Sequence, residues 1–271
     1  MTNAYTCNRL VSEAAALGVE LSIVGVHDTM VTAEGLYNAG KLLEKRDFVI
    51  NRYKWGKGKD EINALAVRSY NSLKNYQTYI NKYEQVKRIR SEDFLIPKYL
   101  MTASQGNYET IATYLGVPFV VKGLESSMGA EVLLIEKEED FCQLGKRYGM
   151  EKEWLCEEFI KTSIGRDLRF FSIRGEAVAC MVRKSQGDFR ANVALGATVE
   201  PYEITPEIQR IAKDIYGQTE LDFLGIDLMF GKNKPYFCEI NVMPGIVGIE
   251  TASGVNIAKI MIEVIKKDFE K

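Results

Sequence analysis

The sequence contains a single histidine, His27, among its 271 residues. A Ser-His-Asp triad or a metal site built from several histidines is therefore disfavoured, because His27 would have to serve alone. No apolar run reaches the roughly 18 residues of a membrane-spanning helix. No charged-then-apolar signal peptide follows Met1 either. These absences predict a globular protein of the cytoplasm with no membrane partner.

Cysteine is scarce, and charge of one sign does not dominate. The five cysteines are odd in number, widely spaced and mostly set among apolar neighbours: Cys7, Cys142, Cys156, Cys180 and Cys238. This pattern favours reduced core thiols over disulfides or a zinc site. The net charge is only −2, so the sequence encodes no general attraction to nucleic acid, although local basic clusters can still receive anionic ligands.

The length suits one large domain or two to three small lobes. In the first part, hydrophobic spacing predicts helices over 7–17 and 60–73, strands over 20–26 and 47–52, and a further helix that contains Asn81 to Glu84. Such alternation predicts a small α/β lobe.

From Val117 onward the pattern changes to strand hairpins with single helices, for which antiparallel pairing is the economical interpretation. We expect strands over 118–122, 131–135, 154–160, 167–173 and 177–183, and helices over 139–148 and 255–267. Thr205 is expected to cap another helix that begins at Pro206.

Two further strands bring oxygen-bearing side chains together. Glu239 and Asn241 alternate in a strand and so share a face. An odd loop, with Gly231 opposite Pro235, would place Asp227 opposite Glu239, whereas a two-residue loop would turn Asp227 away. Two carboxylates and an amide oxygen suit a hard cation such as Mg²⁺. The alternative is an ordinary hairpin whose polar residues face solvent.

A second segment has the composition of a phosphate clamp. Lys122 ends a Val-Val-Lys strand, and a loop of small residues, Ser126, Ser127 and Gly129, follows it. The lysine offers a point charge to phosphate oxygens, and the small residues let backbone N–H groups approach closely. The alternative is a hairpin turn with a surface lysine.

The segment 154–160 is an apolar strand interrupted by two acids, Glu157 and Glu158, and Asp167 follows after a short loop. Such an edge strand could offer backbone groups to an adenine and a carboxylate to ribose hydroxyls; an amphipathic strand is the alternative. The loop 183–192 combines cations with Gly187, which suits either a loop that meets anions or a solvated surface loop.

Taken together, the order of these elements resembles the ATP-grasp ligases, and most closely their α-L-glutamate ligase branch, from about residue 81 to residue 271. Lys82 stands fifteen residues before Pro97, as one lysine of that family stands before a Pro-containing strand. The other matches are Lys122, the loop from Ser126 to Gly129, Asp167, the Arg-x-Asn element Arg190 to Asn192, and the triplet Asp227, Glu239 and Asn241. Glu158-Phe159 stands where the family carries Glu-Tyr, a change that backbone contacts to adenine tolerate.

The resemblance implies an α/β (α+β) ATP-grasp fold in which two α+β lobes, about 81–156 and 157–271, clamp ATP. A small α/β N-terminal domain, 1–80, would precede them. Family members usually open with a strand, whereas this chain begins almost on a helix at Cys7. We therefore expect either a start codon placed too late or a trimmed first lobe.

The resemblance also implies the site chemistry. Lys82 and Lys122 would bind the phosphates, and two Mg²⁺ ions, replaceable by Mn²⁺, would bridge them. Nucleotide contacts would come from Ser126, Ser127, Gly129, Glu157, Glu158, Phe159, Asp167, Arg190 and Asn192. Arg169 and Arg190 would lie near the transferred phosphoryl group and the oxyanion.

An acceptor carboxylate would form an acyl phosphate, which an amino group then attacks to give an amide. The implied partners are ATP, an acidic small molecule or a peptide or protein end as acceptor, and glutamate or a similar amino acid as donor. A homo-oligomer is compatible with the sequence.

Two alternatives stay open: a macrocyclase that forms ester or amide cross-links within a peptide, and an ATP-binding module without catalysis. The sequence does not name the acceptor, although Arg52, Lys54, Arg183 and Lys184 could bind carboxylates.

Overall fold

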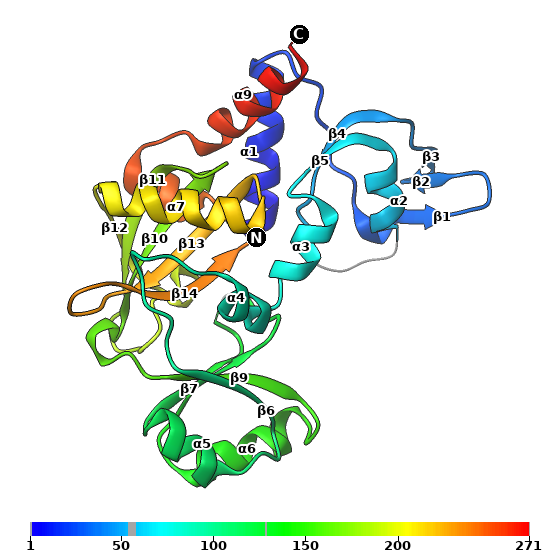
Figure 1. Ribbon diagram of the computed structural model, residues 1–271. Coiled ribbons are helices and arrows are strands. Elements are labelled where there is room, and N and C mark those ends of the chain that lie inside the picture. Colours follow the sequence, from blue (N-terminus) through cyan, green and yellow to red (C-terminus); the bar gives the residue numbers. More distant parts are fainter. Residues whose placement is uncertain (1, 54–57, 128, 271) are drawn as a thin grey trace.

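The structure is a computed structural model that describes residues 2–53, 58–127 and 129–270. Three parts are visible in Figure 1: a lobe built on one sheet at the bottom, a larger lobe built on a second sheet, and an N-terminal part beside the larger lobe. Within these residues, every helix is too short or too polar to cross a membrane.

The larger lobe is built on a five-stranded antiparallel sheet with the order β12-β11-β10-β13-β14. Its strands are β10 (Arg166–Ile173), β11 (Glu176–Lys184), β12 (Thr198–Pro201), β13 (Phe223–Met229) and β14 (Tyr236–Asn241). Strand side chains alternate between faces, so β10 sends Phe170 into one apolar core and Phe171 into another. The sheet is thus buried on both faces.

Helices close both cores of this sheet. The Phe170 side is covered by α7 (Pro206–Thr219), α3 (Leu73–Tyr79) and α4 (Lys82–Arg88); the Phe171 side is covered by α1 (Thr2–Ala16), α8 (Val247–Ser253) and α9 (Ile257–Phe269). Thr205 caps α7 as predicted, because its hydroxyl accepts from the backbone N–H of Ile208.

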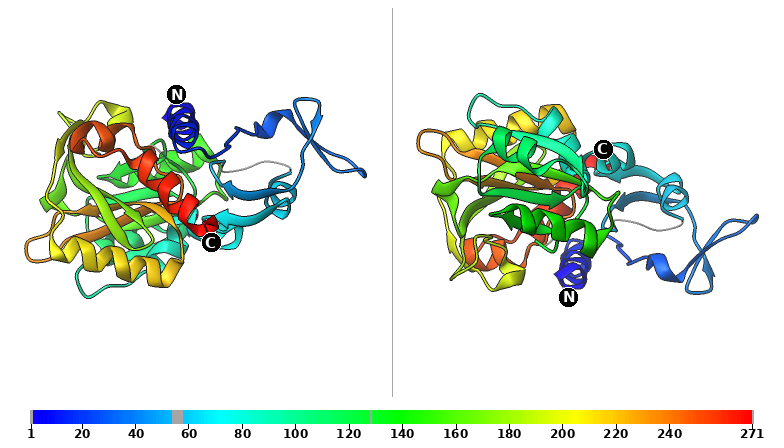
Figure 2. Two further views of the ribbon diagram at one scale, coloured as in Figure 1. Left: turned by 90° about the horizontal axis from the view of Figure 1, so that it is seen from above. Right: turned by 90° about the horizontal axis from the view of Figure 1, so that it is seen from below.

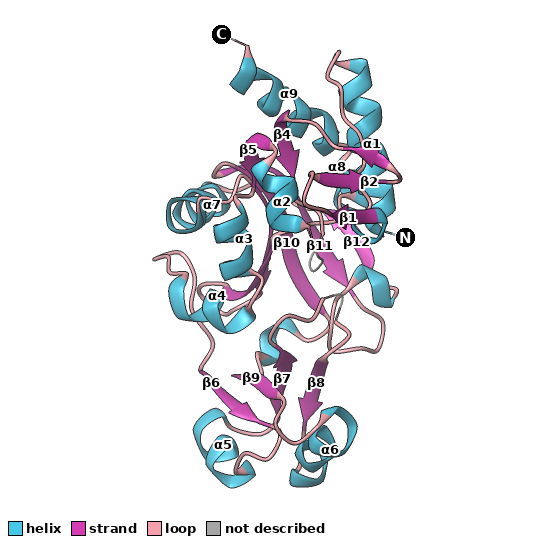
Figure 3. Ribbon diagram, turned by 90° about the vertical axis from the view of Figure 1, so that its right-hand side faces the viewer, coloured by secondary structure: helices cyan, strands magenta, loops and turns pink. Residues whose placement is uncertain are grey.

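The smaller lobe is a four-stranded antiparallel sheet with the order β6-β9-β7-β8. Its strands are β6 (Tyr99–Ala103), β7 (Phe119–Gly123), β8 (Val132–Ile135) and β9 (Glu153–Glu158), and its helices are α5 (Tyr108–Leu115) and α6 (Glu138–Tyr148). Figure 3 shows both helices below the sheet, where Ile111, Phe119, Phe141 and Trp154 form the core. The predicted antiparallel hairpins are confirmed.

The N-terminal part has little core of its own. Strands β4 (Arg46–Ile50) and β5 (Ala66–Tyr70) pair in parallel, with α2 (Lys59–Ala64) between them. A small sheet of β1 (Thr29–Val31), β2 (Leu36–Asn38) and β3 (Lys41–Leu42) stands away from the body, as Figure 2 shows. Short 3₁₀ turns occur at Val26–Asp28, Lys161–Ser163 and Val193–Leu195.

Two predicted elements are wrong. The strand expected over 20–26 is irregular chain that leads into the 3₁₀ turn, because no strand in the described part of the chain pairs with it and Ile23 remains 54% exposed. The helix expected over 60–73 ends at Ala64, since β4 offers a backbone partner to the following residues, which form β5. The domain boundary at residue 80 stays a prediction; Tyr76 and Tyr79 share a core with Phe170.

Candidate functional site

A cavity opens between the two sheets, with an empty volume of about 830 Å³ that includes space open to solvent. It is lined by side chains of both lobes and of the loops that join them. Thirteen of the predicted site residues line it: Lys82, Lys122, Ser126, Ser127, Gly129, Glu157, Glu158, Phe159, Asp167, Arg190, Asn192, Asp227 and Glu239. Arg169 and Asn241 lie behind this lining, where each contacts Asp227.

The hairpin of β13 and β14 places Asp227 directly opposite Glu239, as predicted. The predicted reason is wrong, however. Next to the turn the register pairs Met229 with Tyr236, which corresponds to an even loop, and a β-bulge then shifts the register by one residue at Cys238. A bulge re-aims the residues around it, so Cys238 and Glu239 both line the cavity.

Asp227 is held by two arginines. Arg169, its cross-strand partner, donates from Nε and Nη2 to the two carboxylate oxygens at 2.6 Å each, and Arg183 donates to Oδ2 at 2.9 Å. Burial favours the protonated acid, but Arg169 and then Arg183 outweigh it and lower the pKa of Asp227. The carboxylate is therefore ionised at neutral pH.

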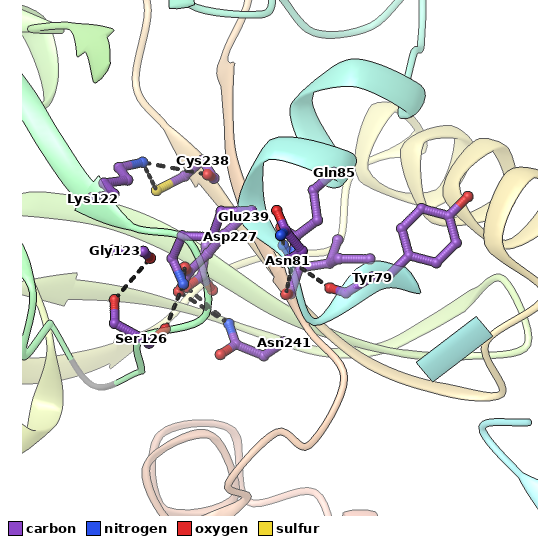
Figure 4. A network of polar contacts seen from close by, with 12 residues as sticks. Tyr79, Asn81, Gln85, Lys122, Gly123, Ser126, Asp227, Cys238, Glu239 and Asn241 are labelled. Atoms are coloured by element: carbon purple, nitrogen blue, oxygen red, sulfur yellow. Dashed lines mark hydrogen bonds and ion pairs between the residues drawn. The ribbon is translucent and has the colours of Figure 1, made fainter. Parts of the chain in front are cut away.

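Glu239 is held by a lysine from the opposite side. Lys82 Nζ lies 3.0 Å from Glu239 Oε2 and donates to the backbone carbonyl of Ser126 at 2.6 Å. Burial would raise the pKa of Glu239, but Lys82 lowers it below its usual value. Asn241 joins the pair through weak bonds from Nδ2 to Asp227 at 3.3 Å and to Glu239 at 3.4 Å (Figure 4). The three predicted ligands thus lie together.

The deep wall of the cavity contains a buried pair, Lys122 and Glu157, whose Nζ and Oε2 atoms are 2.5 Å apart. Burial opposes the charge of Lys122, but nearby acidic groups, with Cys238 and Glu157 first, raise its pKa. Glu157 is 2% exposed, and its Oε1 has no hydrogen-bond partner among the described residues. A buried acceptor without a donor is costly, so Oε1 suits a ligand N–H group.

Asp167, predicted to bind ribose, is paired with Arg183, which donates to both carboxylate oxygens at 2.6 and 2.5 Å. The two residues are cross-strand partners because a bulge between Phe171 and Ser172 shifts the β10–β11 register. Burial raises the pKa of Asp167 even though Arg183 opposes that shift. Arg183 is 2% exposed and lines the cavity, where its carboxylate partners are Asp167 and Asp227 of the chain itself.

Two loops meet over the open side of the cavity. Arg190 is paired with Asp188 at 2.7 Å and donates to the backbone carbonyls of Gly129 at 2.8 Å and Val132 at 3.3 Å. Gly129 has φ of +73°, and a Cβ there would come within 2.9 Å of Asn192 Oδ1. Only glycine fits this close approach easily, so the Gly129 and Asn192 segments are built to touch.

Sequence reasoning missed several lining residues: Arg166, Phe189, Met229 and Cys238. Phe189 meets Phe159 edge to face at 6.1 Å, so the phenyl ring that replaces the expected tyrosine lies in an aromatic contact. Glu158 accepts from the backbone N–H of Lys98 at 2.9 Å. Lys54, a predicted carboxylate binder, and residue 128 of the predicted phosphate loop lie outside the described residues.

The donor set excludes some metals and fits others. The described residues contain no group of three or more His, Cys, Asp or Glu side chains that could hold a metal ion. Asp227 and Glu239 form only a pair, completed by the amide of Asn241. This set lacks the nitrogen and sulfur donors that zinc prefers. With the Asn241 amide turned so that its oxygen replaces Nδ2, it fits Mg²⁺, which keeps several waters or phosphate oxygens.

Comparison with known proteins supports the same interpretation. Residues 80–265 match the RimK-like ATP-grasp domain. A probable alpha-L-glutamate ligase of Marinomonas sp. (strain MWYL1) is 30% identical over 97% of this chain and 92% of its own length. A protein of the same description from Thioalkalivibrio sulfidiphilus (strain HL-EbGR7) is 35% identical over 59% of this chain, and that match spans 54% of the relative, about half its length.

Solved structures share the fold. The ATP-grasp ligase PsnB, complexed with a minimal precursor, Mg and ADP, has a TM-score of 0.71 and 15% identity, covering 97% of this chain and 93% of PsnB. The macrocyclase MdnC from Microcystis aeruginosa MRC, bound with precursor peptide MdnA, has a TM-score of 0.72 and 15% identity, covering 97% and 96%. At these identities the likeness shows the fold alone, and the predicted fold class is confirmed.

Proposed function

The chain belongs to the RimK-like ATP-grasp family, and from that premise we propose that it is an ATP-dependent ligase that joins a carboxylate to an amine. The amine donor would be glutamate or a similar amino acid, as the names of the curated relatives suggest. The acceptor would be an acidic small molecule or the C-terminus of a peptide or protein.

One observation carries this proposal: two lysine ammonium groups and two ionised carboxylates converge in the same cavity. Lys82 comes from α4, which packs on the larger lobe, and Lys122 comes from β7 of the smaller lobe. Asp227 and Glu239 come from β13 and β14. A nucleoside triphosphate with its divalent cations needs both kinds of group close together: cations for the phosphate oxygens and carboxylates for the metal ions.

The reaction would need no protein nucleophile. The acceptor carboxylate attacks the γ-phosphorus and ADP leaves; the amine then attacks the acyl carbon, loses a proton, and phosphate leaves. Mg²⁺, when bound, would neutralise the developing phosphate charge. Lys82 and Lys122 would hold phosphate oxygens, and Arg190 would face the charge that develops during transfer. Positioning and charge neutralisation would then account for catalysis, in keeping with the single histidine.

Ligand binding would exchange partners within the charge network. Lys82 neutralises Glu239 when no nucleotide is bound, and Arg169 with Arg183 neutralises Asp227. A phosphate oxygen can replace Glu239 as the partner of Lys82, which releases Glu239 to a cation of higher charge. The carboxylates are therefore ionised and in place beforehand, and their ionisation is no part of the cost of binding.

The deep wall of the cavity, where Glu157 lies 2.5 Å from Lys122, would hold the base. Glu157 Oε1 is buried without a donor partner among the residues described, and a base that carries an exocyclic amino group would supply one. Adenine carries an amino group at C6, whereas guanine carries a carbonyl oxygen there, and with C6 placed against Oε1 the carboxylate would repel guanine. We therefore expect ATP to be preferred over GTP.

The first test is ADP release in the presence of ATP, Mg²⁺, glutamate and a panel of carboxylate acceptors that includes short peptides, with mass spectrometry of the products. Acceptor-dependent ADP release with a mass gain that matches the donor residue would support the ligase. ATP binding without turnover for every acceptor would contradict it and favour a nucleotide-binding module.

A second candidate is a macrocyclase that forms ester or amide bonds within one peptide. The observation that favours it is the whole-chain likeness to PsnB and MdnC, both solved with precursor peptides. The same mass measurement separates the two, because an internal bond removes one water from the peptide, whereas an added amino acid increases its mass.

A further inference from the structure

The strand that carries Glu239 and Asn241 lies at the edge of its sheet. An edge strand has backbone groups on one side that no neighbouring strand can satisfy. Beside the turn, Leu95 satisfies them: its N–H donates to Pro235 at 2.9 Å and its carbonyl accepts from Phe237 at 2.8 Å. That protection stops before the two ligands, so another group has to cover the edge there.

Gln85 covers it. Its Oε1 accepts from the backbone N–H of Ile240 at 2.8 Å, and its Nε2 donates to the Ile240 carbonyl at 3.0 Å. The second amide proton goes to the carbonyl of Tyr79 at 2.6 Å, so both donors of this buried side chain are used. The side chain therefore imitates one residue of a neighbouring strand. Figure 4 shows Gln85 reaching from α4 toward β14.

The backbone N–H and carbonyl of Ile240 point toward the free edge of the sheet because of the bulge. Backbone groups point toward the free edge at every second residue, as the Phe237 N–H does. Without the extra residue at Cys238, the backbone groups of Glu239 would therefore point there instead of those of Ile240. The bulge instead turns Glu239 into the cavity and leaves the Ile240 amide and carbonyl at the edge. The two peptide groups that Gln85 binds are those between Glu239 and Ile240 and between Ile240 and Asn241.

We propose that Gln85 is a positioning residue for the metal site. It does not line the cavity, so it acts by fixing the two peptide planes that aim Glu239 and Asn241. Lys82, one turn earlier on α4, binds the Glu239 side chain. One helix thus holds both the backbone and the charge of the ligand strand. The inference rests on the proposed function, because it assumes that these residues bind Mg²⁺ with a nucleotide.

The test measures metal binding directly rather than turnover. Mn²⁺ stands in for Mg²⁺, and the electron paramagnetic resonance signal of free Mn²⁺ is titrated against the protein in the presence of ADP. Gln85→Met keeps the length of the side chain but removes both bonds to Ile240. We expect its Mn²⁺ dissociation constant to rise about 10-fold, the low end for residues that orient metal ligands. Gln85→Ala, which leaves room for water at the strand edge, serves if the methionine variant does not fold.

The chain offers a matched control. Gln218 makes the same two-way bond to a backbone: its Oε1 accepts from the N–H of Arg90 at 2.8 Å, and its Nε2 donates to the Arg90 carbonyl at 2.7 Å. Neither residue lines the cavity. Gln218→Met should therefore bind Mn²⁺ as the wild-type protein does.

Unchanged Mn²⁺ affinity in Gln85→Met, or an equal loss in Gln218→Met, would overturn the positioning role. If the wild-type protein bound no Mn²⁺ with ADP, the proposed function itself would fail, and the inference with it. A loss confined to the Gln85 variants supports the inference.

Discussion

Two networks of arginines and carboxylates lie on the same five-stranded sheet. One, the cavity network, consists of Arg169, Arg183, Asp167 and Asp227. The other, the distal network, lies where β10 ends and β13 begins; it consists of Arg68, Arg174, Asp222 and Asp268, and Tyr70 donates to Asp268 at 2.5 Å. Each contains two cations and two anions, so composition does not distinguish them.

The surroundings distinguish the two networks. In the cavity network, Asp227 and Arg183 have side chains 1% and 3% exposed, and Glu239 beside them is held by a lysine that a phosphate can take over. The distal network joins β5, the β10–β11 turn and α9, and its arginines Arg68 and Arg174 are 43% and 25% exposed. Under the proposed function, only the first has beside it a pair, Lys82 and Glu239, whose partners a bound nucleotide would exchange. The comparison predicts catalytic effects from one network and stability effects from the other.

The largest contrast is expected between Glu239→Gln and Asp222→Asn. The first removes a charge that would serve both metal ions, and ADP release should fall at least ~100-fold. The second weakens the charged hydrogen bonds that the buried Asp222 accepts, and should lower the free energy of unfolding by about 1.5 kcal/mol while turnover stays near wild type. Steady-state ADP release and urea unfolding measure the two effects.

Either variant can break this contrast. Near-normal ATP turnover in Glu239→Gln would remove Glu239 from the metal site. Loss of turnover in a folded Asp222→Asn protein would show that the distal network also serves the reaction, and the division between the two networks would then be wrong.

Arg190 sharpens the comparison, because it is ion-paired to an aspartate as the distal arginines are, yet it lines the cavity. Arg190→Met should lower kcat about 100-fold, the size expected when a donor to developing charge is removed. The KM for ATP should change little, since the partner charge develops only during reaction.

Arg210 provides the control for Arg190. It binds Asp93 through two bonds of 2.7 and 2.8 Å on the far surface of α7. Arg210→Met should leave both kinetic constants unchanged. An unchanged kcat in Arg190→Met would argue against its role at the transferred phosphoryl group, and a rise in KM alone would assign it to ATP binding.

The cavity network also shows how far the sequence could predict the site. Alternation along one strand predicted that Glu239 and Asn241 share a face, whereas Asp227 was placed with them through an odd loop that the structure does not have. The resemblance to the ATP-grasp ligases supplied most of the predicted cavity lining. The pairings themselves depend on two β-bulges, one before Glu239 and one between Phe171 and Ser172. A bulge follows from the fit of a whole sheet and has no reliable sequence signal.

Arg183 illustrates the limit. It stands beside Lys184 in a basic segment, which left open a loop that meets anions and a solvated surface loop, and only the shifted register brings it opposite Asp167. The failed elements of the N-terminal part have a similar cause: residues 66–70 form a strand because β4 is beside them, a partner that lies about 20 residues away in the sequence. Local pattern predicted chemistry well where one strand or loop carries it, and poorly where tertiary pairing decides.

The smallest expected effect tests whether the distal network acts on stability alone. Hydrogen bonding from Arg174, ahead of Tyr70, lowers the pKa of Asp268 to about 2, below its ordinary value of 3.8. Because the folded state holds the proton less tightly than the unfolded state, the stabilisation is present above pH 3.8 and is lost as the pH falls toward 2. Solvent screening should keep it below ~1 kcal/mol.

Asp268→Asn should therefore lose stability at pH 5 and approach the wild-type protein at pH 3, as measured by urea unfolding at both values. Glu263→Gln on the same helix, whose lysine partner lies 3.8 Å away in an exposed pair, controls for loss of a surface charge. If Asp268→Asn differed from wild type equally at both pH values, the hydrogen bonds rather than the charge of Asp268 would be what joins α9 to the sheet. The distal network would then stabilise the fold through geometry, while the cavity network depends on charges that a ligand can exchange.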